Sequence, residues 1–539
     1  MQVLGKTKAG KILPNLYETG QIILAVMALL SLKFLLDNNM NVNEEDVLPL
    51  AKQYADPNWI AGDWYLNQPP SYRLLFETLF GRLIVTWGFL ATSVVGRLLC
   101  YALVAGGLVL IGRKMCLNMP FLMLAIGLFI YTSHRQGIAA SEWLLGGLEP
   151  KTVAYGLVLL AIGLMLAGYY FWMALMLGLA TSFHVLVGGW TFVVVLGWLA
   201  LRWKTRLQGI RHFGSIVLIY LLASAFAIKP VLEQLFAPFP GSSVTPSYIY
   251  VFLRLPHHLN PLSWHSNWWL KLAAYLLVLA FSVSLLWRQQ QSDQLSAQYT
   301  ACMELAEFTM LCLVPFMLSL AVAPFDSEGS FLQYYPFRLG DVMLPLNTCL
   351  LFACALQQTF KQRERRVLSL VCILLFSGAC SIQAVTFQKQ LLTLSQFSKV
   401  NLESIALCDW VRTHTPTDTV VVSPPVELVK FTWLAERSTI AKFKLLPQTK
   451  ARILEWYERL SDLSGGFFPG TTKERTKDRR NRMMRALTYG YNHLTTAQAD
   501  ALMTKYRATY FITGIKHKLD LAIAYRNSRY ILYSKKTSE

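Results

Sequence analysis

The chain has 539 residues, of which 54% are hydrophobic and only 15% charged, and its mean hydropathy is +0.38. Soluble domains are about one quarter charged, so this composition excludes an ordinary soluble protein. The net charge of +19 would suggest nucleic acid in a soluble chain. Here basic loops that set membrane orientation explain much of it, and no nucleic-acid partner is expected.

Apolar blocks of about 18–25 residues, long enough to cross a bilayer, predict a polytopic helical membrane protein. An acidic outer loop (37–90) follows the first span, and within it 71–82 has the apolar spacing of a helix on the membrane interface. About eleven spans are expected, at roughly 17–36, 90–112, 119–133, 152–169, 171–185, 188–201, 213–229, 267–287, 303–323, 340–358 and 367–386.

Basic residues gather in alternate loops, namely GKTKAGK, the Arg113-Lys114 pair, RWKTRLQGIR and KQRERR. A cytoplasmic N-terminus puts all four on the cytoplasmic side, as the positive-inside rule requires. The opposite loops hold the acids, the histidines and many aromatics. The sequence therefore predicts a multi-pass plasma (inner) membrane protein with its C-terminus outside the cytoplasm.

From about residue 395 the composition becomes that of a soluble domain. TVVVSPP, STIAKFKLL, ATYFITG and RYILYSK read as strands, and 401–414, 447–461 and 495–506 as helices. We therefore expect a mainly α fold with a polytopic domain (1–390) and a small α/β extracytoplasmic domain (395–539). The basic run TTKERTKDRRNRMMR either contacts phosphates or is a solvated surface.

The stretch NEEDVLPLAKQYADPNWIAGDWYLNQ (43–68) is the first candidate for chemistry. A carboxylate beside the membrane is a candidate general base for a hydroxyl or amine that attacks an activated donor. Interleaved Trp and Tyr side chains suit sugar binding, although they also mark membrane interfaces, and loop acids are often only solvated. Its acids are Glu44, Glu45, Asp46, Asp56 and Asp63.

Further candidates lie at the outer ends of the spans. In SEWLLGGLEPKT the candidates for function are Glu142, Glu149 and Lys151, and the alternative is that Glu149 and Lys151 only form an ion pair with each other. His184, in SFHVLVGGW, is either a ligand or a bonded core histidine. No nucleotide-binding, GxSxG or HExxH motif occurs, and the cysteines lack metal-ligand spacing. No cofactor and no metal are therefore expected.

Two basic segments suit an anionic ligand at the outer leaflet. LRLPHHLNP supplies Arg254, His257 and His258, which can hold a phosphate by charge-assisted hydrogen bonds. YYPFRLGD supplies a lipid-phosphate clamp: Tyr335, Arg338 and Asp341. The alternative for this second segment is a structural ion pair between Arg338 and Asp341.

This layout resembles the GT-C superfamily of membrane glycosyltransferases. Those proteins have a cytoplasmic N-terminus, one span, and a large outer loop with an Asp-Glu pair near its start. EEDVLPLAKQYADP is similar, and anchoring on Ala51-Lys52 places Asn43-Glu44 where Asp-Glu is expected, whereas a shift of one residue places Glu44-Glu45 there. Most of the chain also resembles an uncharacterised bacterial polytopic family, in GDWYLNQPPSYRLLFETLFG, LGGLEPKTVAYG, FHVLVGGW, RLPHHLNP, YPFRLGDVMLP and CDWVRTHTPTDTVVVSPP.

The resemblance implies an inverting glycosyltransferase that takes a sugar from a polyprenyl-phosphate donor among the membrane lipids. The acceptor would be a lipid, a glycan or a protein. Glu44 or Glu45 would be the catalytic base, with Asp63 as second choice, and Arg338 and Arg254 would hold the phosphate. Two alternatives stay open: a lipid or glycolipid flippase without chemistry, and a scaffold whose outer domain binds a partner.

Overall fold

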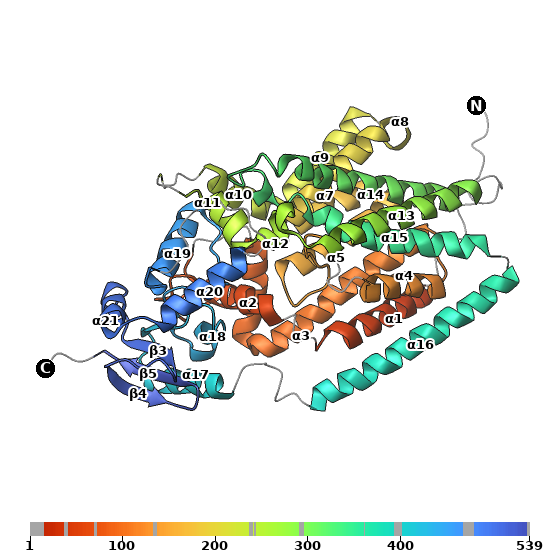
Figure 1. Ribbon diagram of the computed structural model, residues 1–539. Helices are drawn as coiled ribbons and strands as arrows, with labels where there is room; N and C mark the ends of the chain where they lie inside the picture. The colour runs from red at the N-terminus through yellow and green to blue at the C-terminus, as the bar shows by residue number, and fades with distance from the viewer. Residues whose placement is uncertain are drawn as a thin grey trace, which may run out of the picture.

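The computed structural model describes residues 16–36, 41–68, 73–132, 137–207, 209–236, 241, 244–289, 296–360, 362–392, 402–466 and 479–535. Most of this chain is α-helix, and one five-stranded sheet forms near the C-terminus. The helices make an elongated bundle with the sheet unit at one end (Figure 1). The predicted fold class, mainly α with a small C-terminal α/β unit, is confirmed.

All eleven predicted spans coincide with helices. Five described helices are long and apolar enough to cross a membrane: α3 (Leu74–Lys114), α13 (Ser266–Gln289), α14 (Ser296–Val322), α15 (Arg338–Thr359) and α16 (Gln362–Leu392). A sixth forms if α9 (Ile210–Ala223) and α10 (Ala225–Phe236), bent by 77°, count as one. The other predicted spans are α1 (Leu16–Phe34) and four helices of 14 to 17 residues: α4 (Met119–Thr132), α5 (Pro150–Leu166), α6 (Tyr170–Phe183) and α7 (Val185–Leu201). The last four are shorter than the ~20 residues of a straight span.

The acidic segment after the first span is a helix over much of its length, which corrects the predicted loop. α2 (Asn41–Ala55) packs on the first part of α3, because apolar side chains such as Val47 and Leu48 are buried there. Gly81 permits this close packing, since a Cβ there would lie 2.1 Å from the carbonyl oxygen of Ala51. The predicted interfacial helix and second span are continuous in α3, which breaks at Gly88, where φ is +78°.

The C-terminal sheet has the strand order β2-β1-β3-β5-β4. β1 (Val420–Val422), β2 (Ser438–Thr439) and β3 (Tyr510–Gly514) are parallel, while β4 (Ala522–Arg526) and β5 (Tyr530–Ser534) pair antiparallel at the other edge. The mostly exposed β4 was not predicted. Around the sheet lie α17 (Leu402–His414), α18 (Phe431–Ala435), α19 (Lys450–Leu463), α20 (Arg479–Asn492) and α21 (Thr496–Lys505). Residues 471–478 of the predicted basic run lie outside the described residues.

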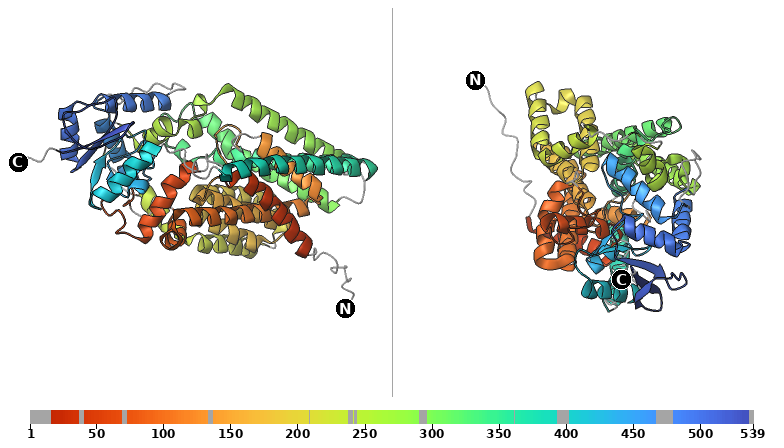
Figure 2. Two further views of the ribbon diagram at one scale, coloured as in Figure 1. Left: turned by 90° about the horizontal axis from the view of Figure 1, so that it is seen from below. Right: turned by 90° about the vertical axis from the view of Figure 1, so that its left-hand side faces the viewer.

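This C-terminal unit contacts the bundle through α2 and the turns that follow it. Lys52 and Glu436 lie 3.6 Å apart as an ion pair, and Lys430 lies 2.9 Å from Glu45. The turn between α15 and α16 lies at the far end of the bundle (Figures 1 and 2). One end of the bundle therefore carries the α/β unit and the acidic helix, and the other carries a basic loop.

Candidate functional site

The segment 137–149, between α4 and α5, is a buried irregular loop that wraps around two carboxylates. The carboxylate of Asp341 accepts backbone N–H bonds from Ile138, Ala139, Ala140 and Glu142, at 2.6–3.0 Å. The backbone N–H of Leu148 donates to Glu44 at 2.5 Å. Buried backbone donors need partners, so these two acids fix the path of the loop.

Glycines let this loop approach the acids. A Cβ on Gly147 would lie 2.6–2.7 Å from side-chain atoms of Glu44, and one on Gly137 would lie 2.3 Å from a carboxylate oxygen of Asp341. Real Cβ atoms essentially never come this close. The small residues of this loop are therefore required by its contact with Glu44 and Asp341.

Glu142, held by this loop, is the centre of a buried charged cluster. Its carboxylate lies 3.0 Å from Arg338 Nε and 3.2 Å from Lys151 Nζ, and His258 Nδ1 lies 4.0 Å away. Burial alone would raise the pKa of Glu142, but the charges of Arg338 and Lys151 outweigh it and lower the pKa to about 2. Glu142 is therefore ionised and bridges two cations.

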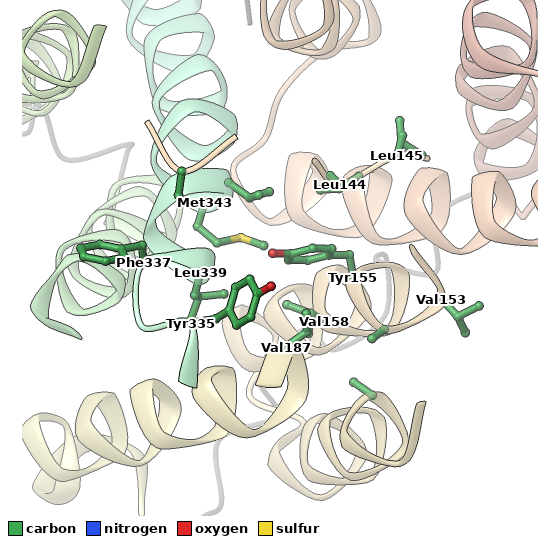
Figure 3. Close-up of a cluster of buried hydrophobic side chains, with 14 of the residues drawn as sticks. Leu144, Leu145, Val153, Tyr155, Val158, Val187, Tyr335, Phe337, Leu339 and Met343 are labelled. Carbon is green, nitrogen blue, oxygen red and sulfur yellow. The ribbon is translucent and has the colours of Figure 1, made fainter. Parts of the chain in front are cut away.

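Aromatic rings and histidines surround these cations. The guanidinium of Arg338 lies 3.8 Å from the ring centre of Tyr335, and its NH1 is 3.3 Å from His184 Nε2. The ammonium of Lys151 lies 3.2 Å from the ring centre of Trp143. The Tyr335 ring lies among apolar side chains that include Val187 and Leu339 (Figure 3). The cluster therefore combines cations with aromatic faces, as in sites for anionic or sugar-bearing ligands.

Two residues beside the cluster have backbone conformations that L-residues rarely adopt. Ser141, next to Glu142, has φ of +54°, and Tyr335 has φ of +53°. Strained non-glycine residues tend to occur at functional sites, where the surrounding structure holds them. This observation motivates a functional assignment of the cluster.

Arg254 and Lys444 form a second group of cations where the bundle meets the C-terminal unit. Arg254 donates to the backbone carbonyls of Phe443, at 2.9 Å, and Lys444, at 3.0 Å. Tyr250 and Tyr335, with ring centres 6.1 Å apart, each lie close enough to act electrostatically on both Arg254 and Arg338. The second group therefore adjoins the Glu142 cluster.

The two histidines of LRLPHHLNP also adjoin the cluster. The ring of His258 lies 6.2 Å from that of Tyr335, and its Nδ1 is 2.6 Å from the carbonyl oxygen of Ala140. Burial lowers the pKa of His258 to about 4, so its ring is neutral at pH 7. The ring of His257 lies 4.1 Å from that of His258.

The three predicted catalytic acids have different environments. Glu44 is buried and accepts from Arg97 Nε at 2.9 Å and from Ser93 as well as from the loop. The carboxylate of Glu45 lies 2.9 Å from Lys430 and 3.8 Å from Lys444.

Asp63 joins the turn after α2 to the sheet. It accepts backbone N–H bonds from Tyr65, Leu66 and Thr439, at 2.8–3.1 Å. Burial raises its pKa to about 6, against the lowering effect of these hydrogen bonds. These contacts place Asp63 at the junction of the two parts rather than beside Glu142.

The ion pairs differ from the simple alternatives considered for the sequence. Lys151 pairs with Glu142, while Glu149 accepts from Asn43 Nδ2 at 3.1 Å and has its pKa raised by burial. Arg338 also pairs with Glu142, because Asp341 is occupied by backbone donors. Neither Glu149–Lys151 nor Arg338–Asp341 is an ion pair of the described chain.

Sequence reasoning missed one functional candidate, Lys444. It named Glu142 together with Glu149 and Lys151, but not its central position, which depends on the path of the loop. The sequence signal for Lys444 is the alternation in Lys442-Phe443-Lys444. Lys442 Nζ donates to Ser423 within the C-terminal unit, at 2.7 Å, whereas Lys444 faces the bundle.

A pocket of about 230 Å³ lies apart from this cluster, between the turns after α2 and the C-terminal unit. Its lining includes Trp64, Thr439, Arg459 and Lys505. Arg459 and Lys505 already pair with Glu455 and Asp462. The chemistry-bearing groups converge at Glu142 and Arg254, so we place the candidate site there. Among the described residues, no group of three or more His, Cys, Asp or Glu side chains could hold a metal ion.

Residues 403–463 match the model of a domain of unknown function, DUF6798. No curated protein matches the chain. The crystal structure of ArnT from Cupriavidus metallidurans bound to undecaprenyl phosphate is similar at 13% identity and a TM-score of 0.38, over 96% of this chain and 99% of that one. At this TM-score the likeness adds nothing to the assignment of the site.

Proposed function

We propose that this protein is a membrane glycosyltransferase that moves a sugar from a polyprenyl-phosphate donor to a lipid, glycan or protein acceptor at the extracytoplasmic face. The observation that carries the proposal is the convergence of Arg338, Lys151 and Arg254 with histidines, aromatic rings and carboxylates. These groups come from α5, α15 and the segment before α13, far apart in the sequence. A phosphate whose prenyl chain lies in the bilayer would be within reach of cations at the ends of these helices.

The reaction needs two things from the protein. The acceptor oxygen or nitrogen forms a bond to the anomeric carbon, the bond from that carbon to the phosphate oxygen breaks, and polyprenyl phosphate leaves with the electron pair. Cations that stabilise the growing negative charge on the phosphate lower the barrier. In the proposal Arg338 and Arg254 do this, with Lys151 beside them.

The second requirement is a base for the acceptor proton. Of the three predicted acids, Glu45 fits best, because a base needs an oxygen with spare hydrogen-bonding capacity. The carboxylate of Glu44 already accepts hydrogen bonds from Arg97, Ser93 and Leu148. The carboxylate of Asp63 accepts three backbone N–H bonds. Among the described cations, Lys444 is the one at ion-pair distance from the second carboxylate oxygen of Glu45, at 3.8 Å.

The test uses purified protein in liposomes with undecaprenyl-phosphate-linked hexose and pentose donors, and follows donor consumption. Glu45→Gln should abolish transfer while the protein stays folded and keeps its binding of undecaprenyl phosphate. Glu44→Gln should instead lower stability, because it disrupts the buried pair with Arg97. Full transfer by Glu45→Gln would remove it as the base, and wild-type protein that consumes neither donor would contradict the glycosyltransferase proposal for those sugars.

A flippase for a lipid or glycolipid is the second candidate, favoured by the 77° break between α9 and α10. Broken helices often line transport paths. A flippase would move labelled lipid across proteoliposome membranes without breaking the sugar–phosphate bond. Lipid movement with intact donor would therefore favour the flippase over the transferase.

A further inference from the structure

The C-terminal unit brings a buried cation against the bundle with no hydrogen-bond partner in the described chain. The ammonium of Lys444 is shielded from solvent, and within the described residues it donates no hydrogen bond. Its nearest acid, Glu45, is 3.8 Å away and is already paired with Lys430 at 2.9 Å. A buried ammonium without hydrogen bonds is unfavourable unless a ligand supplies acceptors.

Arg254 makes the local charge more positive. Its guanidinium is buried and bonded to neutral carbonyls, and none of the described carboxylates lies at ion-pair distance from it. Burial, together with the neighbouring charge of Arg480, lowers the pKa of Arg254 to about 10, while Asp46 acts in the opposite direction. Burial also lowers the pKa of Lys444. Two adjacent cations that are each destabilised in this way favour binding of an anion between them.

We propose that Lys444 and Arg254 together form an oxyanion site for the phosphate of a polyprenyl phosphate, so that the C-terminal unit completes the substrate site of the membrane bundle. This inference deepens the proposed function and rests on it for the identity of the lipid. Each part supplies one cation: Arg254 from the bundle and Lys444 from the segment that matches DUF6798. Lys444 would bind the phosphate, and Glu45, the proposed base, lies 3.8 Å from it.

The alternative is that Lys444 only docks the C-terminal unit. Two docking contacts are separate from Lys444, because Lys52 pairs with Glu436 at 3.6 Å and Asp63 accepts the backbone N–H of Thr439, whereas the contact of Lys430 with Glu45 shares its acid with Lys444. Lys52→Met therefore removes a docking ion pair without touching Arg254. Lys505→Met, which removes a lysine paired with Asp462 on the same unit, controls for loss of charge elsewhere.

The experiment measures binding to full-length protein in nanodiscs, by native mass spectrometry, with undecaprenyl phosphate, uncharged undecaprenol and inorganic pyrophosphate as probes. Lys444→Met should weaken undecaprenyl phosphate binding by about tenfold or more, the size of a lost charge-assisted contact, and leave undecaprenol binding unchanged. Lys444→Arg should restore most of the affinity. Lys52→Met and Lys505→Met should bind as the wild type does.

Several results would overturn the inference. Unchanged undecaprenyl phosphate binding by Lys444→Met, or an equal loss in Lys52→Met, would return Lys444 to a docking role. Lys444-dependent pyrophosphate binding with no gain from the prenyl chain would assign the site to a soluble phosphate instead of a lipid. Binding is independent of turnover, so lysine-dependent binding without sugar transfer would support this inference while the proposed transferase activity failed.

Discussion

Replacing the central carboxylate Glu142 by Gln should lower the stability of the ligand-free protein and raise its affinity for a phosphate. The pKa of Glu142 is about 2, against an ordinary 4.5, and this difference corresponds to a stabilisation of about 3 kcal/mol. Because the pKa is lowered on folding, that stabilisation is present above pH 4.5 and is lost as the pH falls toward 2. At pH 7 Glu142→Gln should therefore lower the free energy of unfolding by about 3 kcal/mol.

The same substitution leaves Arg338 and Lys151 without the acid that neutralises them. An incoming phosphate then meets two unopposed cations, and its affinity should rise by about tenfold. At a lipid concentration 100 times the Kd, binding stabilises the folded state by about 2.7 kcal/mol. Undecaprenyl phosphate should therefore restore most of the stability that Glu142→Gln removes.

The assay is thermal unfolding of the protein in nanodiscs, followed by tryptophan fluorescence, with and without undecaprenyl phosphate. Glu307→Gln is the matched control, since Glu307 accepts from Arg202 Nε at 3.0 Å in another Arg–Glu pair. That variant should show neither the gain in affinity nor the rescue. If Glu142→Gln loses stability and also binds undecaprenyl phosphate no better than wild type, then Arg338 and Lys151 do not hold the phosphate.

Three further predictions concern the supports of the site. Gly147→Ala should push the Glu44 carboxylate from its place and destabilise the protein by about 1–3 kcal/mol, measured by thermal unfolding, whereas Gly189→Ala, where a Cβ meets nothing within 4 Å, should have little effect. Burial raises the pKa of Asp63 from 3.8 to about 6, so its contribution to stability is lost as pH rises through 6: unfolding free energy should fall by about 1.4 kcal/mol between pH 5 and 7.5, and Asp63→Asn should remove this dependence. Asp341→Asn replaces one accepting oxygen by an NH₂ group, which cannot accept a hydrogen bond from the loop backbone. Hydrogen exchange of the backbone amides of 138–142 should therefore be faster than in the wild type.

The sequence was sufficient to predict which segments would reach the site, because polar residues at the ends of apolar helices must find partners. Arg338, Lys151, His184 and His258 all lie around Glu142 as a result. The class of the fold followed from hydropathy in the same way. The roles assigned to Glu44, Glu45 and Asp63 stay predictions.

The pairing of charges could not be predicted, because it depends on the path of an irregular loop. Spacing along a helix suggested that Arg338 would pair with Asp341, but four backbone donors of the loop occupy that acid. Lys444 lies 190 residues after Arg254 in the chain, yet its backbone carbonyl accepts a hydrogen bond from Arg254. Only the docking of the C-terminal unit brings these two residues together.

The three consecutive acids of α2 show why a base cannot be assigned by counting along the sequence. Successive residues of an α-helix point about 100° apart, so neighbours must serve different surfaces. Glu44 bonds to Arg97 of the bundle, Glu45 pairs with Lys430 of the C-terminal unit, and Asp46 accepts from the hydroxyl of Tyr65 in the turns after α2. The resemblance to the GT-C first loop leaves the register open by one residue, and one residue is enough to move the acid from the bundle to the C-terminal unit. In the proposed reaction the base is the acid of this helix that faces the proposed phosphate-binding cation Lys444, and that acid is Glu45.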